Sequence, residues 1–350
     1  MLFIEAPVAS HAVKSPEVTL REISDFPNIV VLQIKVPASR WGDSAWVDKE
    51  RRRVVQSALA GPLGKNFQSP VQWFYDPMAV TAFAGHLDER AIVYDCMDEL
   101  SLFRDAPPEL VRRERELLAV ADVVFAGGAK LWKAKRLLNA NCFSFGCGVD
   151  EKHFGRARDP EVALPADVAE LPRPILGYIG VVDERVDYDL VAKLADATSG
   201  SVVMVGPSTK VDPETFPRRG NLHWLGSRDY AELPAYAKSF NVCMIPFAMN
   251  EATAFINPTK ALEYMASGRP IVSTLVEDVA LQFSEVITIA HEHAEFIDAC
   301  ERCAARPSRA QIDRGLAMVR RRSWESIVCQ LEQHIADALA SKRTLDISAA

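Results

Sequence analysis

The stretch FINPTKALEYMASGRPIVST, residues 255–274, decides how the rest of this chain is interpreted. Asn257 is a favoured N-cap residue, and Pro258 suits the first helical position because a backbone N–H group would have no partner there. We therefore predict a helix that begins at this point and ends at Gly268, since glycine commonly closes helices. Residues 270–274 (PIVST) then predict a short, buried strand.

Two residues of this helix point to a ligand. Lys260 lies in the first turn, where the partial positive charge of a helix N-terminus disfavours a cation by about 0.3–1 kcal/mol. A lysine beside free backbone N–H groups makes a good seat for a diphosphate, and Glu263, one turn further on, can accept hydrogen bonds from the two hydroxyls of a ribose. The alternative is an ordinary surface ion pair between Lys260 and Glu263, which is common and weak.

The bulk properties leave room for two domains. The chain has 350 residues, 49% hydrophobic and 25% charged, with a formal net charge of −7. This charge disfavours non-specific nucleic-acid binding, and no apolar run approaches the roughly 20 residues of a membrane-spanning helix. Residues 1–7 (MLFIEAP) do not have the pattern of a signal peptide. The seven cysteines are scattered, so we predict a cytoplasmic protein with reduced thiols. Cys300 and Cys303 form a lone C-x-x-C with no second pair to complete a zinc site, so we predict no bound metal.

A pattern of short apolar runs that alternate with helical segments occurs twice along the chain. Between the two occurrences, residues 159–174 (DPEVALPADVAELPRP) are rich in proline, alanine and acids. Strands that alternate with helices predict parallel sheets with helices on both faces. The predicted strands are 2–4, 29–36, 71–75, 91–94 and 122–125 before this segment, and 175–180, 201–206, 222–226, 241–246 and 270–274 after it.

We therefore predict an α/β protein made of two Rossmann-like domains that face a cleft. The boundaries that we expect are an N-terminal domain at 1–158, a linker at 159–174, a nucleotide-binding domain at 175–322 and a final helix at 323–342. Ligands of such open sheets bind at the carboxyl ends of the strands, so the site is expected there.

Residues 257–270 resemble the nucleotide-binding segment of GT-B fold glycosyltransferases, the family-4-like group that transfers sugars from nucleotide donors. Many members carry two glutamates spaced E-x7-E. Glu263 matches the second, and Phe255 stands in place of the first, which in the family usually contacts the donor sugar. The resemblance implies a UDP- or GDP-linked sugar as the donor, no separate cofactor and no metal. It also implies that the final helix crosses back to the N-terminal domain.

Residues 177–185 (GYIGVVDER) resemble the first strand and loop of the family's nucleotide domain. Gly180 lets this loop approach a phosphate closely, because glycine has no side chain. The resemblance implies that Arg185 pairs with the diphosphate and complements Lys260. The alternative is that Arg185 forms a solvated loop pair with Asp183.

Four further residues complete the expected nucleotide site. Gly206 and Arg228 follow two other strands of the second half, in segments that lie around the base and the phosphates in the family. For Arg228, a surface arginine is an equal alternative. Asn257 and Thr259 stand at the start of the anchor helix, beside Lys260.

The residues expected to act on the acceptor follow a strand of the first half. In residues 94–99 (YDCMDE) a carboxylate can take the proton from an acceptor hydroxyl, and our order of preference is Asp98, then Asp95, then Glu99. The alternative is that Asp98 caps the next helix.

Other segments carry weaker expectations. Residues 51–53 (RRR) are predicted to be a solvated helix face, and residues 230–236 (YAELPAY) a packing helix. In the loop before the anchor helix, the donor sugar is expected to contact Asn250, Glu251 or Thr253. Residues 1–7 resemble the second strand of the related enzymes, so we expect their opening strand–helix unit to be absent here.

The predicted function is transfer of a sugar from a nucleoside-diphosphate donor to a glycan, lipid or other hydroxyl acceptor, in polysaccharide biosynthesis. The expected partners are that donor and a glycan or lipid-linked acceptor, with peripheral contact to the inner face of the membrane and no nucleic acid. Two alternatives remain open because a fold does not fix chemistry: a nucleotide-sugar epimerase and a non-catalytic binding protein.

Overall fold

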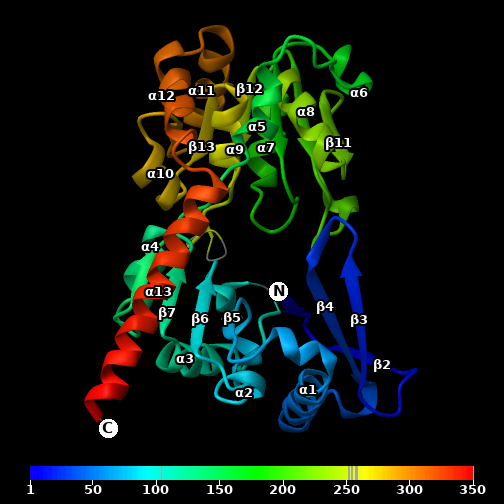
Figure 1. Ribbon diagram of the computed structural model, residues 1–350. Coiled ribbons are helices and arrows are strands. Elements are labelled where there is room, and N and C mark those ends of the chain that lie inside the picture. The colour runs from blue at the N-terminus through cyan, green and yellow to red at the C-terminus, as the bar shows by residue number, and fades with distance from the viewer. Residues whose placement is uncertain (104, 251–252, 254, 257–258, 350) are drawn as a thin grey trace.

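The structure is a computed structural model that describes all residues except 104, 251–252, 254, 257–258 and 350. The two halves of the chain form two α/β bodies, and a long C-terminal helix runs from the second body back along the first (Figure 1). In the described part of the chain no helix combines the length and apolar character that crossing a membrane requires.

The C-terminal body is built on one parallel six-stranded sheet in the order β11-β10-β9-β12-β13-β14. The order reverses between β9 and β12, and this kind of switch point is where open α/β sheets bind ligands. The strands are β9 (Ile175–Ile179), β10 (Ser201–Val205), β11 (Leu222–Gly226), β12 (Val242–Ile245), β13 (Ile271–Thr274) and β14 (Thr288–Ala290).

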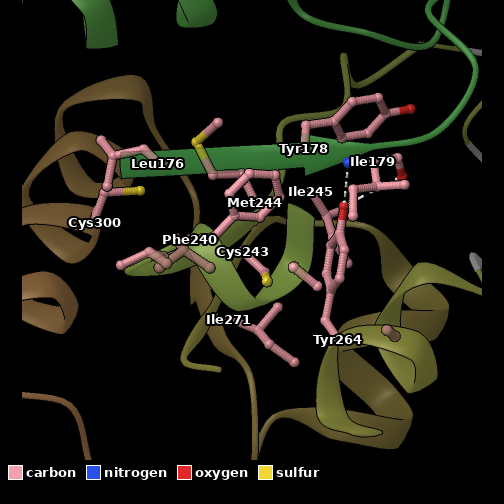
Figure 2. Close-up of a cluster of buried hydrophobic side chains, with 14 of the residues drawn as sticks. Leu176, Tyr178, Ile179, Phe240, Cys243, Met244, Ile245, Tyr264, Ile271 and Cys300 are labelled. Atoms are coloured by element: carbon pink, nitrogen blue, oxygen red, sulfur yellow. Dashed lines mark hydrogen bonds between the residues drawn. The ribbon is translucent and has the colours of Figure 1, made fainter. Parts of the chain in front are cut away.

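Helices cover both faces of this sheet and give it a dense core. Figure 2 shows Phe240 packed against the strand that carries Leu176 and Tyr178. Glycine is needed at position 177, because a Cβ there would lie 2.2 Å from the Phe240 ring. The helices are α5 (Glu151–Gly155), α6 (Ala166–Ala169), α7 (Tyr188–Ala197), α8 (Leu233–Ser239), α9 (Lys260–Ser267), α10 (Glu277–Phe283), α11 (His293–Ala305) and α12 (Arg309–Val319).

The N-terminal body contains two separate sheets. One is parallel, in the order β5-β6-β7-β8, whereas in the other β4 pairs in parallel with β1 and β2 and antiparallel with β3. The strands are β1 (Leu2–Ile4), β2 (Val8–Ser10), β3 (Glu17–Ile23), β4 (Phe26–Pro37), β5 (Val71–Phe74), β6 (Ala91–Cys96), β7 (Val123–Ala126) and β8 (Cys142–Ser144). The helices are α1 (Ser44–Leu59), α2 (Val80–Phe83), α3 (Leu110–Val120) and α4 (Ala129–Lys135).

The strands predicted for the N-terminal half pair in parallel, but they lie in two sheets, and one of these sheets also contains the unpredicted antiparallel strand β3. Residues 24–25 form a two-residue turn, so β3 and β4 fold back on each other as a hairpin. Most of β3 is exposed to solvent, so its sequence lacks the apolar run that would predict a strand.

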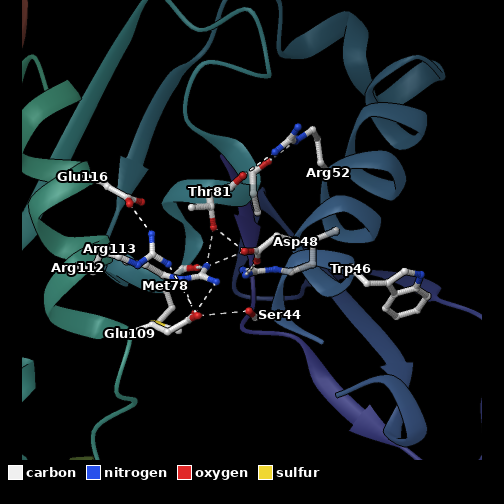
Figure 3. A network of polar contacts seen from close by, with 12 residues as sticks. Ser44, Trp46, Asp48, Arg52, Met78, Thr81, Glu109, Arg112, Arg113 and Glu116 are labelled. Carbon is white, nitrogen blue, oxygen red and sulfur yellow. Dashed lines mark hydrogen bonds and ion pairs between the residues drawn. The ribbon is translucent and has the colours of Figure 1, made fainter. Parts of the chain in front are cut away.

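A buried ionic network joins α1, α2 and α3 (Figure 3). Asp48 accepts hydrogen bonds from Arg113 at 2.7 Å and from Thr81 at 2.5 Å. The predicted solvated face at residues 51–53 is wrong for Arg51, which is only 5% exposed and lies over the Phe83 ring. Arg51 is buried because it pairs with Asp48 inside this network.

The boundary between the bodies lies earlier than the predicted residue 158. Val149, Phe154 and Ala157 belong to the hydrophobic core of the C-terminal body, and α5 packs against α9. The reason is that the segment before the Pro-rich stretch already carries apolar residues at positions that face the C-terminal sheet.

The last helix, α13 (Trp324–Ala349), crosses back to the N-terminal body as predicted (Figure 1). Its Leu331 and Ile335 pack against Val123 and Phe125 of β7, and His334 stacks on the Phe143 ring with the ring centroids 3.7 Å apart. These contacts hold α13 on the N-terminal body, although the chain enters this helix from the C-terminal body.

Candidate functional site

Two glycines bring the strand ends of the C-terminal sheet close together. Gly180 follows β9 and donates its N–H to Val205, and Gly206 follows β10 and donates to Gly226. A Cβ on Gly206 would lie 1.9 Å from the carbonyl oxygen of Gly180, and both glycines have positive φ angles of +144° and +152°, which L side chains rarely adopt. Both predicted glycines therefore shape one surface at the carboxyl edge of the sheet.

Lys260 lies against this surface. A Cβ on Gly180 would be 2.1 Å from Cε of Lys260 and 2.5 Å from its Nζ. The ammonium group also stands 5.4 Å from the ring centroid of Tyr178 and 5.7 Å from that of Phe247. Burial lowers the pKa of Lys260, and the nearby Glu263 carboxylate opposes this shift. A half-buried cation of this kind is stabilised by an anionic ligand.

The helix that carries Lys260 is tied directly to β9. The Tyr264 hydroxyl accepts a hydrogen bond from the backbone N–H of Ile179 at 2.7 Å, and both residues are buried (Figure 2). The helix ends at Gly268 in a left-handed conformation, as predicted. The predicted N-cap Asn257 and the first-turn Pro258 lie outside the described residues, and Thr259 is exposed just before the helix.

Arg185 is held in place by its neighbour in the loop after β9. Its Nε and Nη2 donate to the Asp183 carboxylate at 2.6–3.0 Å, and Asp183 is only 6% exposed. These hydrogen bonds raise the pKa of Arg185, and the charge of Asp98 on the N-terminal body adds to the effect. The Asp183 pair weighed in the sequence analysis thus exists, but it is largely buried and not solvated.

Glu263 lies one turn beyond Lys260, at the same junction. Burial raises the pKa of its carboxyl group, and Lys260 opposes the shift. Burial raises the pKa of Tyr230 and of Cys147, and the charge of Glu263 adds to both shifts. The sequence analysis gave neither residue a role in the site. Tyr230 stacks on the His153 ring at a centroid distance of 4.0 Å. The predicted packing role does not fit Tyr230, which is 55% exposed; its position shortly after β11 is the sequence signal for the carboxyl edge of the sheet.

Asp95 and Asp98 come from the end of β6 on the opposite body. Burial raises the pKa of each to about 6, opposed at Asp95 by a hydrogen bond from Trp73 and at Asp98 by the charge of Arg185. Burial raises the pKa of Cys147, and the charges of Asp98, Glu263 and Asp95 add to this shift. Of the two predicted acids, Asp98 is therefore the one whose pKa is affected by the charge of Arg185.

Two other expected residues are occupied elsewhere. Glu99 binds Lys135 at 2.7 Å in a buried pair and also accepts from Ser101, so it serves the structure beneath the Asp98 loop. Arg228 pairs with Asp167 at 2.8 Å and donates to the Tyr236 hydroxyl at 2.7 Å. We therefore leave both out of the assembled site.

The loop before α9 makes contacts with both bodies. Asn250 donates to the backbone oxygen of Glu184 at 3.0 Å, and Thr253 is buried; Glu251 lies outside the described residues. Phe255 packs against the core of the N-terminal body, with Nζ of Lys130 at 4.8 Å from its ring centroid. Among the described residues, no three His, Cys, Asp or Glu side chains are grouped so as to hold a metal ion.

Part of the C-terminal body is similar to known glycosyltransferases in sequence. Residues 173–306, which include Gly180, Lys260 and Glu263, match the family model described as glycosyl transferases group 1. A protein of Bacillus subtilis (strain 168), whose name assigns it provisionally to teichuronic acid biosynthesis as the glycosyltransferase TuaH, is 24% identical over 135 residues. The aligned part covers 37% of this chain and about a third (34%) of that protein.

Solved structures confirm the predicted fold over the whole chain. A trehalose 6-phosphate synthase from Burkholderia multivorans superimposes with a TM-score of 0.68 at 13% identity and covers 100% of this chain and 91% of its own. A sucrose-phosphate synthase from Thermosynechococcus elongatus gives 0.64 at 19% identity, over 92% and 86%. HepE from Anabaena in complex with UDP-glucose gives 0.61 at 14% identity, over 83% and 82%. The chain therefore has the two-body GT-B architecture.

Proposed function

We propose that this chain is a glycosyltransferase that moves a sugar from a nucleoside-diphosphate donor to a hydroxyl acceptor. The observation that carries the proposal is the meeting of Lys260, Arg185 and Glu263 at the switch point of the C-terminal sheet, opposite Asp98 of the other body. The match of residues 173–306 to glycosyl transferases group 1 supports it.

In this proposal the donor diphosphate lies against Gly180 and Gly206. Lys260 and Arg185 supply the positive charge that stabilises the departing nucleoside diphosphate, and Thr259 and the following backbone N–H groups of α9 add hydrogen bonds. Because two cations and a helix end offset the leaving-group charge, we propose that transfer needs no metal ion.

The nucleoside end is assigned to Glu263 and Tyr230. Glu263 accepts hydrogen bonds from the ribose hydroxyls. These hydrogen bonds would offset the cost of burying part of its carboxylate. Tyr230 is 55% exposed and already stacked on His153, so its free face offers a platform for the base.

Asp98 is assigned as the general base, with Asp95 as second choice. A base must be largely ionised at the working pH and still hold a proton well enough to accept it, and a pKa of about 6 meets both needs. Arg185 favours the ionised form of Asp98. The residue that binds the donor diphosphate therefore also acts on the base that activates the acceptor.

The finer features of the function are also proposals. UDP and UDP-glucose occur in the complexes of HepE, and we propose a UDP- or GDP-linked hexose as the donor here. The name of the Bacillus relative supports a glycan or lipid-linked acceptor in polysaccharide biosynthesis. Such an acceptor fits a protein that works in the cytoplasm at the inner face of the membrane.

The test is release of nucleoside diphosphate from UDP-, GDP- and ADP-sugars, with and without a panel of glycan and lipid-linked acceptors. The proposal predicts acceptor-dependent release that falls at least a hundredfold in Asp98→Asn. Conversion of the donor sugar without acceptor would instead identify an epimerase, and a folded chain that neither binds nor turns over any donor would contradict the proposal.

A further inference from the structure

Glu184 is a buried carboxylate that the proposed roles do not use. It lies in the loop between β9 and α7, next to Arg185, and its side chain is only 13% exposed. Both carboxylate oxygens are buried, and within the described part of the chain no hydrogen-bond donor reaches either of them. Buried carboxylates normally have hydrogen-bond partners, because leaving them unpaired costs free energy.

The surroundings place Glu184 at the junction between the two bodies. Asn250 donates to its backbone oxygen, and Nζ of Lys210 is 3.8 Å from Oε1, beyond hydrogen-bond distance. The same Nζ lies 5.3 Å from the ring centroid of Phe103, which belongs to the N-terminal body. The carboxylate therefore has a compensating charge nearby while its hydrogen-bonding capacity is left for a ligand.

A sugar supplies the missing donors. A carboxylate offers two oxygens that together accept hydrogen bonds from two neighbouring hydroxyls, an arrangement that sugars present and phosphates do not. The Cα atoms of Glu184 and Arg185 are about 3.8 Å apart because they are consecutive. The sugar of a nucleotide donor is bonded directly to the second phosphate, so its hydroxyls come within reach of a residue adjacent to the proposed diphosphate ligand Arg185.

We propose that Glu184 accepts hydrogen bonds from hydroxyl groups of the transferred sugar and thereby determines which donor sugar is bound. This rests on the proposed function, since it assumes the diphosphate lies at Lys260 and Arg185. Glu184 is a specificity-determining residue in this account, and the base remains Asp98.

The test compares each nucleotide with its sugar conjugate. Calorimetry on the full chain measures Kd for UDP and UDP-glucose, GDP and GDP-mannose, and ADP and ADP-glucose, in the wild type and in Glu184→Ala, Glu184→Gln and Glu214→Ala. Glu214 is an exposed acid in the short 3-10 helix Pro213–Thr215 and controls for the loss of one negative charge. For the pair that the wild type binds, Glu184→Ala should weaken the sugar conjugate about tenfold or more, as loss of hydrogen bonds to a charged group does.

The free nucleoside diphosphate should bind Glu184→Ala as well as the wild type or better, because removing a negative charge beside a diphosphate cannot repel it. Glu184→Gln, which keeps the shape, should show a smaller loss, and it replaces the alanine variant if that variant fails to fold. Equal losses for the nucleotide and its conjugate, or no loss for either, would overturn the inference. Failure of the wild type to bind any of the six probes would instead contradict the proposed function itself.

Discussion

At the scale of single residues, the absence of a side chain at Gly180 is what lets Lys260 reach the strand end. The sequence predicted Lys260, Glu263 and Gly180, because a cation in a first helical turn and a glycine after a buried strand are local signals. It missed Tyr230, Cys147 and Glu184. Tyr230 interacts with Glu263, Cys147 with Asp98 and Glu263, and Glu184 with Asn250. These partners lie between 33 and 116 positions away along the chain, so no local sequence pattern predicts the contacts.

Gly180→Ala should therefore damage the site more than the fold. The new Cβ would collide with the flexible end of Lys260, which can move aside, so we expect a loss of about 1–3 kcal/mol in the free energy of unfolding. Nucleoside-diphosphate affinity should fall about tenfold or more as the ammonium is displaced. In Gly206→Ala the Cβ would meet the backbone oxygen of Gly180, so denaturant titration should show a larger loss of stability. A Gly180→Ala variant with wild-type affinity would refute this role for the glycine.

The elevated pKa of Asp98 sets a pH dependence for both rate and stability. If Asp98 is the base, kcat/KM should fall as the pH is lowered through about 6, because the carboxylate takes up a proton. An unfolded aspartate titrates near 3.9, so the folded chain binds this proton more tightly. The ionised form therefore costs stability above pH 6, and that cost diminishes between about pH 6 and pH 4.

Asp98→Asn should consequently be more thermostable than the wild type at pH 8 and lose this advantage as the pH falls through that range. Thermal unfolding at several pH values measures it. A stability difference that does not change with pH would mean that Asp98 is not the buried titrating group described here.

At the scale of elements, the ionic network of the N-terminal body shows where periodicity misleads. The pattern of α1 predicted arginines on a solvated face. Arg51 is buried instead, because its guanidinium pairs with Asp48 and packs over the Phe83 ring. The strands β9 to β13 were predicted within one residue at each end because they are short, mostly apolar runs, whereas β14 was not predicted. The β3–β4 hairpin was not, since its outer strand is polar and exposed.

Asp48→Ala should destabilise the chain by about 3–5 kcal/mol, because it leaves the 4% exposed Arg113 guanidinium without its closest carboxylate. Glu116→Ala is the matched control on α3, since its pair with Arg112 is exposed and should be worth less than about 1 kcal/mol (Figure 3). Chemical denaturation of both variants distinguishes the two cases. Similar small losses would show that the buried network contributes little to stability.

At the scale of the whole molecule, the two bodies meet through a few defined contacts besides α13. Asp278 of α10 is 2% exposed and accepts a hydrogen bond from the backbone N–H of Lys130 at the start of α4. Lys130 also pairs with Glu277 at 2.8 Å. These contacts help to fix the relative orientation of the two bodies, in which Asp98 faces Arg185. The repeated strand–helix pattern and the Pro-rich segment between its two occurrences predicted the two-body arrangement, but no sequence signal identified the residues that join the bodies.

Asp278→Ala should loosen this relation and increase the radius of gyration of the nucleotide-free chain in small-angle scattering. Glu277→Ala should change it less, because the Lys130 pair is half-exposed. Nucleotide affinity should change little in both variants, since the diphosphate ligands belong to the C-terminal body. An unchanged radius in Asp278→Ala would show that α13 alone fixes the two bodies.

The central claim, that Lys260 and Glu263 form a nucleoside-diphosphate site, is tested most directly by calorimetry of the wild type, Lys260→Ala and Glu263→Ala with UDP, GDP, ADP and dTDP. The account predicts saturable binding of one nucleotide by the wild type and a loss of at least tenfold in each variant. Wild-type affinity in both variants, or no binding of any nucleotide by the folded wild-type chain, would contradict it.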